Sequence, residues 1–267
     1  RLGSNENPFG CSPKVLEAIR GELSDALRLY PDPNAERLKR AIADYYGVTP
    51  AQVFVGNGSD EVLAHIFQAL FQHPAPLLFP DITYSFYPVY CGLYGVEYVT
   101  VPLAEDFSLR VTDYLRPNGG IIFANPNAPT GCLLALADIE WLLRHNRDSA
   151  VVVDEAYIEF HGVTHSRMTW VLEHANLIVL RTFSKLAGLA GLRVGYGAFS
   201  STLMPHFWKI KQPYNVPVSA SAAAIAALSD VEGLHANVAR LTAERDRMSE
   251  ALSELGWLQP YPSRSNF

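Results

Sequence analysis

The stretch Ala150-Val151-Val152-Val153-Asp154 is an unbroken apolar run that ends in a carboxylate. Such a run is typical of a strand that is buried on both faces of a parallel sheet. Leu177–Leu180 repeats the pattern and is followed, after Arg181-Thr182-Phe183-Ser184, by Lys185. Open α/β sheets bind ligands at the carboxyl ends of their strands, so Asp154 and Lys185 are both expected at the ligand-binding edge.

Strand-like and helix-like segments alternate on either side of this stretch, which predicts an α/β fold with a mainly parallel sheet flanked by helices. Ser12 is expected to cap the first helix, and Asn34 the second, which should end at Gly47. The expected strands are Val53–Val55, Pro76–Phe79, Glu97–Val101, Gly120–Ala124, Ala150–Val153, Leu177–Arg181 and Arg193–Ala198. The expected helices are Pro13–Leu23, Ala35–Tyr46, one opened by Ser59 or Asp60 and running through Phe71, Ala137–His145 and Ser219–Leu228.

The pattern divides the chain into parts. Residues 1–33 contain several prolines and are expected to form an N-terminal arm, whereas residues 34–230 form the large sheet domain. From Val231 onward, apolar residues recur at helical spacings, which predicts one long amphipathic helix. That helix would begin a smaller α+β domain over residues 231–267. Because the chain starts without methionine and stops without a closing element, we expect residues to be missing at both ends.

Composition excludes several classes of protein. The formal net charge is −6 and no basic run is present, so a nucleic-acid or anionic-membrane partner has no electrostatic support. Cys11, Cys91 and Cys132 are far apart and form no C-x-x-C pair, which favours a reducing compartment over a disulfide scaffold. No apolar run approaches the roughly 20 residues that span a bilayer. We therefore expect a cytoplasmic protein.

Asp154 and Lys185 have the chemistry to hold an aromatic cofactor. A lysine whose pKa is depressed can act as a Schiff-base nucleophile. An aspartate can keep a ring nitrogen protonated, which makes pyridoxal 5′-phosphate (PLP) an electron sink. An ordinary ion pair between the two residues is an equally open interpretation. Tyr84 and Tyr157 could lie near the ring, although core packing is the simpler interpretation of each tyrosine alone.

Three sets of donors could bind a phosphate. Gly56-Asn57-Gly58-Ser59-Asp60-Glu61 is a glycine-rich turn between a strand and a helix, where backbone N–H groups and the helix dipole favour an anion. Ser184 adjoins Lys185, and the guanidinium of Arg193 suits a phosphate. The turn alone is just as typical of an ordinary connection. Combined with Ser184 and Arg193, it indicates a phosphate site.

Metal and hydrolase chemistry are less well supported. His161 and His165 are four residues apart, with Glu155 and Glu159 upstream. The intervening residues 162–164 are poor helix formers, however, and no third ligand follows at a clear spacing. There is no G-x-S-x-G and no G-x-G-x-x-G motif. The sequence therefore predicts no metal site.

Taken together, these pieces resemble the fold-type I PLP-dependent aminotransferases of class II, most closely those that act on histidinol phosphate. The match extends from one end of the chain to the other, in the order of the family. The strings that resemble the family are Asn5-Glu6-Asn7-Pro8, Tyr30-Pro31-Asp32, Gly56–Glu61, Asn125–Gly131, Val153-Asp154-Glu155-Ala156-Tyr157, Arg181–Lys185 and Leu189–Tyr196.

The resemblance implies a role for each matched residue. Lys185 would bind PLP as a Schiff base and then shuttle a proton between the substrate and the cofactor. Asp154 would pair with the pyridinium nitrogen, and Tyr157 would hydrogen-bond the ring O3′. Tyr84 would stack on the ring. The phosphate would be held by Gly58, Ser59, Asp60, Ser184 and Arg193, and by Tyr30 of the neighbouring subunit in an obligate homodimer with its active site at the interface.

Two departures from the family pattern matter. The family often has an asparagine immediately before Pro-Thr-Gly, where it contacts O3′, but this position is Ala128. Either Asn127 substitutes for it or Tyr157 makes that bond alone. The family's substrate-binding arginine lies after Ser265-Asn266-Phe267, where this sequence ends.

The resemblance implies amino transfer between L-histidinol phosphate and 2-oxoglutarate, giving imidazole-acetol phosphate and L-glutamate in histidine biosynthesis. Two half-reactions with ping-pong kinetics are expected. An aromatic amino acid aminotransferase and a PLP-dependent decarboxylase of a phosphorylated amino acid are the alternatives. A PLP-binding transcriptional regulator would need a DNA-binding domain with a basic face, and this acidic sequence has neither.

Overall fold

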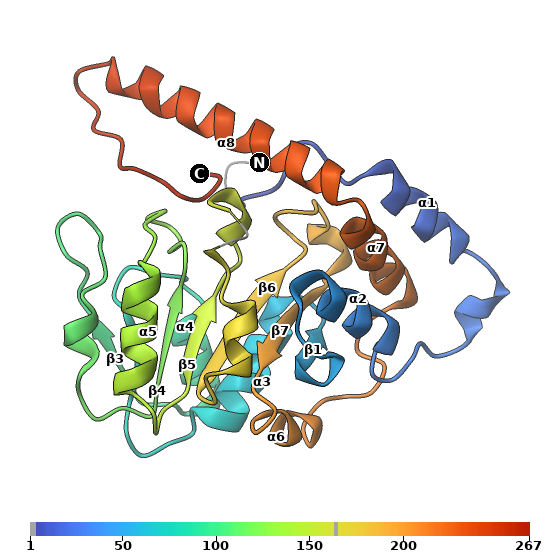
Figure 1. Ribbon diagram of the computed structural model, residues 1–267, viewed down its shortest axis with the longest axis horizontal. Helices are drawn as coiled ribbons and strands as arrows, with labels where there is room; N and C mark the ends of the chain where they lie inside the picture. The colour runs from blue at the N-terminus through green and yellow to red at the C-terminus, as the bar shows by residue number, and fades with distance from the viewer. Residues whose placement is uncertain (1–3, 163–164) are drawn as a thin grey trace.

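A seven-stranded β-sheet forms the centre of the fold, with strand order β1-β7-β6-β5-β4-β2-β3 (Figure 1). The computed structural model describes residues 4–162 and 165–267. Neighbouring strands from β3 to β6 are parallel, whereas β7 is antiparallel to both β6 and β1, which confirms a mainly parallel sheet. The strands are β1 (Val53–Gly56), β2 (Leu77–Pro80), β3 (Tyr98–Val101), β4 (Gly120–Ala124), β5 (Val151–Asp154), β6 (Leu177–Thr182) and β7 (Gly195–Phe199).

Helices cover both faces of the sheet, because its central strands are apolar on both sides. In β5, Val151 and Val153 belong to one hydrophobic core, whereas Val152 belongs to the core on the opposite face. The first core includes α1, α2, α5 and α7, and the second includes α3, α4 and α6. The helices are α1 (Pro13–Gly21), α2 (Glu36–Tyr46), α3 (Ser59–Leu70), α4 (Tyr87–Tyr94), α5 (Leu136–His145), α6 (Met204–Trp208), α7 (Val218–Ser229) and α8 (Val231–Ser253).

One predicted helix cap is wrong. The N-cap of α2 is Ala35, which has a left-handed φ of 51° and no side-chain cap bond, and not Asn34. Asp32 does the capping instead, because its carboxylate accepts hydrogen bonds from the backbone N of Asn34 and of Glu36, both at 2.9 Å. Ser12 does cap α1, where its Oγ accepts from the backbone N of Lys14. The sequence also gave no prediction for α4.

The predicted long helix after Val231 is confirmed as α8, which runs across the carboxyl edge of the sheet (Figure 1). The segment that follows α8 returns toward the N-terminal arm. There the side-chain amides of Asn5 and Asn266 exchange two hydrogen bonds, 2.7 and 3.2 Å between their N and O atoms. The division of the chain at residues 33 and 230 stays a prediction, and residues 1–3 of the predicted arm lie outside the described residues. In the described part of the chain, no helix is long and apolar enough to cross a bilayer.

Candidate active site

A cavity of about 220 Å³ opens where β4, β5 and β6 end and α3 begins. The sequence predicts ligand binding at this edge of the sheet, where the strands have their carboxyl ends. Side chains that are far apart in the sequence converge on it. The predicted site residues that line the cavity are Ser59, Asp60, Tyr84, Asp154, Tyr157, Ser184, Lys185 and Arg193.

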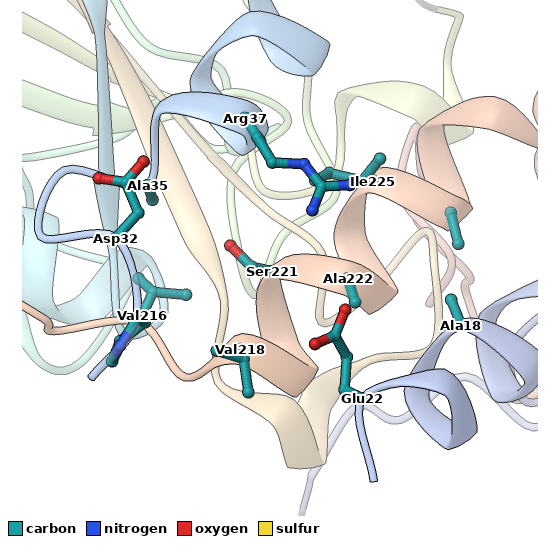
Figure 2. A pocket seen from close by; sticks show the side chains of 12 residues that line it. Ala18, Glu22, Asp32, Ala35, Arg37, Val216, Val218, Ser221, Ala222 and Ile225 are labelled. Carbon is teal, nitrogen blue, oxygen red and sulfur yellow. The ribbon is translucent and has the colours of Figure 1, made fainter. Parts of the chain in front are cut away.

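A second cavity, of about 310 Å³, lies between α1, α2 and α7 (Figure 2). Figure 2 shows Arg37 and Glu22 reaching in from α2 and from the end of α1, on either side of α7. Small apolar side chains such as Ala222 and Ile225 form much of its wall. Its lining has no lysine, histidine, cysteine or tyrosine, and no predicted site residue. The first cavity is therefore the candidate active site.

Asp154 is the last residue of β5, and its side chain is almost fully buried, with 6% of the residue exposed. Oδ1 accepts a hydrogen bond from the backbone N of Ala156 at 3.1 Å, and Oδ2 accepts one from the Tyr87 hydroxyl at 3.3 Å. Burial raises the pKa of Asp154 from 3.8 to about 6, while these two hydrogen bonds lower it. Among the residues that the structure describes, this carboxylate has no ion-pair partner.

Lys185 follows β6 in the turn that leads toward β7, and its side chain is half-buried at the cavity. Nζ donates to the backbone O of Asn5 at 2.8 Å and lies 5.6 Å from the centroid of the Tyr157 ring. Burial lowers the pKa of the Lys185 amine from its ordinary value, because desolvation disfavours the charged form. A neutral amine is the nucleophilic form, so this environment suits covalent chemistry.

The first turn of α3 forms an anion cradle together with Arg193. Gly58 is the N-cap of α3 with no side-chain cap bond, and Ser59 and Asp60 expose the positive end of the helix to the cavity. Arg193 Nη2 pairs with Asp60 Oδ2 at 3.0 Å, and Nη1 lies 3.4 Å from Ser184 Oγ. Helix N–H groups, a hydroxyl and a guanidinium therefore face one space, which is the donor set that a phosphate requires.

Gly58→Ala is expected to weaken this cradle. Gly58 has a φ of +81°, and an added Cβ would lie 2.6 Å from Arg193 Nη2. The methyl group would displace the guanidinium, so we expect phosphate-ester affinity to fall about tenfold or more, the effect of losing one charge-assisted hydrogen bond. Isothermal titration with pyridoxal 5′-phosphate, the phosphate ester that the sequence resemblance implies, measures this affinity.

Gly47→Ala is the control, because Gly47 also has a positive φ, +73°, but an added Cβ would have open space around it. Both variants should lose stability through backbone strain, but only Gly58→Ala should lose affinity. An equal affinity loss in the two variants would contradict the cradle.

Two tyrosines flank the cavity. The Tyr84 hydroxyl donates to Asp60 Oδ1 at 3.1 Å. Asn5 makes a side-chain hydrogen bond to Tyr157, whose ring also packs edge-on against Phe267 with centroids 5.1 Å apart. Burial raises the pKa of both phenols above the ordinary value, so both remain protonated donors.

Three predicted site residues do not line the cavity. Gly58 adjoins it at the N-cap of α3, and Tyr30 is 82% exposed, with its ring stacked on Tyr214 at 4.7 Å between centroids. The side chain of Asn127 binds the segment that follows β2, where Nδ2 donates to the backbone O of Ile82 at 2.9 Å and Oδ1 accepts from the Thr83 hydroxyl at 2.8 Å. Ala128 lines the cavity in its place, so the structure does not support Asn127 as the substitute for the missing asparagine.

The N-terminal arm contributes to the site in a way that was not predicted from the sequence. Asn5 and Glu6 line the cavity, and Asn7 Nδ2 donates to the backbone O of Lys185 at 3.1 Å. The available signal was the string Asn5-Glu6-Asn7-Pro8, whose amides precede a proline in a segment without helix or strand. Nothing in the sequence linked that string to a lysine 178 residues away.

The two glutamates considered as metal ligands are bound to Arg181, which is fully buried. Arg181 Nη1 pairs with Glu155 Oε2 at 3.0 Å, and Nη2 pairs with Glu159. The His161 and His165 rings lie 4.2 Å apart between centroids, and residues 163 and 164 between them lie outside the described residues. Within the described ranges, no group of three or more His, Cys, Asp and Glu side chains is placed to hold a metal.

Comparison with known proteins is consistent with this geometry. Residues 1–267 match the family described as aminotransferase class I and II. A histidinol-phosphate aminotransferase from Pseudomonas putida (strain W619) is 56% identical over 270 residues, covering all of this chain and 77% of that protein. Histidinol-phosphate aminotransferase 2 from Thiobacillus denitrificans is 54% identical, covering all of this chain and 75% of that protein.

A solved structure shares the fold. The crystal structure of histidinol-phosphate aminotransferase from Sinorhizobium meliloti, in complex with pyridoxal-5′-phosphate, matches with a TM-score of 0.90 and 30% sequence identity. The match covers 98% of this chain and 73% of that chain. The similarity in sequence extends over the whole of this chain, and the fold is shared. This chain therefore belongs to the family of class I and II aminotransferases.

Proposed function

We propose that this protein is a PLP-dependent histidinol-phosphate aminotransferase, which transfers an amino group between L-histidinol phosphate and 2-oxoglutarate in histidine biosynthesis. The products would be imidazole-acetol phosphate and L-glutamate. The observation that supports this proposal most strongly is the convergence of Lys185, Asp154 and the α3 anion cradle on one cavity. The similarity to relatives named for this reaction supports the choice of substrate.

The residues present fit PLP. Asp154 is a buried carboxylate without an ion-pair partner in the described chain, and it would gain one from a protonated ring nitrogen. The cradle of Ser59, Ser184 and Arg193 would hold the phosphate. The cavity that these residues line has a volume of about 220 Å³, and Tyr84 is also in its lining. The site therefore offers a partner to each polar end of the cofactor.

PLP, when bound, supplies an electron sink that stabilises negative charge at the substrate Cα. Lys185 Nζ would attach to the cofactor and, once released by the incoming amine, would move the proton at that Cα. Asp154 would hold a proton on the ring nitrogen. Tyr157 would donate a hydrogen bond from its hydroxyl to the ring oxygen, and Asn5 orients that hydroxyl.

A steady-state assay of the purified protein tests the choice of substrate. With PLP and 2-oxoglutarate present, we expect L-histidinol phosphate to be consumed and L-glutamate to form in equal amounts. Aromatic amino acids should react with a much lower kcat/KM, and no CO₂ should be released. Turnover of an aromatic amino acid without turnover of histidinol phosphate would contradict the proposed substrate, as would CO₂ release.

The proposal includes a homodimer with Tyr30 reaching the partner's active site. Tyr30 is 82% exposed, and it does not line the cavity of its own chain. Leu23, Leu27 and Leu29 nearby are also more than half exposed. Neighbouring exposed apolar side chains of this kind mark protein interfaces. A second copy of the chain is the partner that the family resemblance suggests.

Mixing two inactive variants tests this arrangement. We expect Tyr30→Ala and Lys185→Ala each to have low activity alone. After unfolding and refolding together, activity should recover to about a quarter of the wild-type value, because half of the random dimers are mixed and each holds one intact site. No recovery, with mixed dimers present by native mass spectrometry, would show that Tyr30 acts within its own subunit.

We also propose a cytoplasmic location. The described cysteines are all free, and the relatives are named for a small-molecule transamination. Free thiols persist in a reducing compartment.

A further inference from the structure

Tyr87 contacts Asp154 from behind the cavity. It is the first residue of α4 and is fully buried, and its hydroxyl donates to Asp154 Oδ2 at 3.3 Å. The second carboxylate oxygen, Oδ1, accepts from the backbone N of Ala156 at 3.1 Å. Each oxygen of the carboxylate therefore has one donor supplied by the protein. Ala156 lines the cavity, whereas Tyr87 does not.

The position of the Tyr87 ring is fixed by its neighbours. It packs edge-on against Phe79 of β2, with centroids 5.9 Å apart, and against Tyr84, with centroids 5.5 Å apart. Rings in such contacts have little freedom to rotate away. Tyr87 thus contacts both the Asp154 carboxylate at the end of β5 and the ring of Tyr84, which flanks the cavity.

We propose that Tyr87 is a positioning residue, which fixes the plane of the Asp154 carboxylate so that an oxygen lone pair points into the cavity at the ring nitrogen of the cofactor. This inference rests on the proposed function. Tyr87 does not touch the cofactor itself and acts through Asp154.

The physical reason is the burial of the carboxylate. A buried anion without a cation requires hydrogen-bond donors, and removal of one donor leaves an oxygen unsatisfied. Burial raises the pKa of the Tyr87 phenol well above the ordinary value, so the hydroxyl keeps its proton throughout the working pH range. Without that donor, Asp154 would rotate or take up a proton, and either change weakens its bond to the ring nitrogen. The other titratable groups that act on Asp154 are Asp60, Glu155, Lys185, Tyr84 and Tyr157.

Tyr87→Phe tests the proposal, because it removes one oxygen and keeps the ring contacts. We expect the dissociation constant for PLP to rise about tenfold or more, the loss typical of a hydrogen bond to a charged group. With PLP labelled by ¹⁵N at the ring nitrogen, the NMR resonance of the bound cofactor should move toward the unprotonated position. A purely structural role would change the thermal midpoint without moving this resonance.

Tyr114→Phe is the matched control. Tyr114 is also fully buried, but its hydroxyl has no hydrogen-bond partner in the described residues, and it does not line the cavity. This variant should bind PLP with the wild-type dissociation constant and show the wild-type ¹⁵N resonance. An unchanged resonance and affinity in Tyr87→Phe would overturn the proposal, as would equal changes in the two variants.

A double-mutant cycle with Asp154→Asn separates the possible failures. If Tyr87 acts through Asp154, adding Tyr87→Phe to Asp154→Asn should change PLP affinity less than twofold. Additive effects would show that Tyr87 acts by another route.

If the wild-type protein binds no PLP, the proposed function fails. If the wild type binds and Tyr87→Phe binds equally well, only the role of Tyr87 fails. Should Tyr87→Phe not fold, as judged by circular dichroism, 3-fluorotyrosine at the same position keeps the ring and makes the hydroxyl a stronger donor. The ¹⁵N resonance should then move in the opposite direction, toward the protonated position. An unmoved resonance would contradict the proposal.

Discussion

Lys185→Ala is expected to reduce transamination by at least about 10³-fold, because it removes both the covalent anchor and the group that moves the proton at the substrate Cα. Lys185 is the lysine whose Nζ reaches the candidate cavity, 2.8 Å from the backbone O of Asn5. The variant should still bind PLP through the α3 cradle and Asp154, but it should lack the long-wavelength absorbance of the lysine-linked cofactor. Absorbance spectra and initial rates, measured on the same preparations, check both expectations.

Lys209→Ala is the control for this change, because Lys209 is exposed and does not line the cavity. It should keep the wild-type absorbance band and rate. If Lys185→Ala retained the band, another lysine would be the anchor. Retention of the rate as well would remove Lys185 from the mechanism altogether.

Asp154→Asn is expected to have opposite effects on activity and on the stability of the cofactor-free protein. An amide cannot hold a proton on the ring nitrogen, so the rate should fall on the order of 10²- to 10³-fold, typical of losing one electrostatic contact at a reacting group. The same change removes a buried negative charge from the cofactor-free protein. We therefore expect a higher thermal midpoint in the inactive variant.

The stability effect should depend on pH in a defined direction. Burial raises the pKa of Asp154 from 3.8 to about 6 in the folded protein. Its contribution to the free energy of unfolding is therefore fully present below about pH 4 and is lost as the pH rises through 6. Above pH 6, Asp154→Asn should be more stable than the wild type by on the order of 3 kcal/mol, and below pH 4 the difference should vanish.

Urea denaturation of the cofactor-free proteins at several pH values measures this difference. Asp148→Asn is the control, because Asp148 is exposed and does not line the cavity. It should match the wild type at every pH. A wild-type protein as stable as Asp154→Asn at pH 8, or more stable, would contradict the account of an uncompensated buried carboxylate.

Much of this fold could be predicted because its strands are buried on both faces. Gly120–Ala124 is predicted and observed with the same limits, and the predicted run Ala150–Val153 differs from the observed β5 by one residue at each end. Asp154 is the last residue of such a strand, and Lys185 follows another. Because open α/β sheets bind ligands at the carboxyl ends of their strands, both residues were expected at one site. The convergence of these residues with Ser59 and Arg193 is confirmed by the cavity lining. Their cofactor roles stay predictions.

The parts that could not be predicted depend on tertiary contacts. Helix α4 has buried aromatic residues and a glycine, and no alternation of polar and apolar faces indicates a helix. The hydrogen bond from Tyr87 to Asp154 joins residues 67 apart in the sequence, and the bond from Lys185 to Asn5 joins residues 180 apart. The sequence around Asn127 likewise gives no sign that its amide would bind Ile82 and not face the cavity.

Borohydride reduction of the PLP-loaded protein, followed by peptide mapping, tests the central claim most directly. The reduction makes the cofactor bond permanent, so mass spectrometry identifies the modified lysine. The expected result is a single modified peptide that contains Lys185, with no modification at Lys14, Lys39, Lys209 or Lys211. Modification at one of those lysines, or at none, would contradict the assignment of Lys185 as the cofactor anchor.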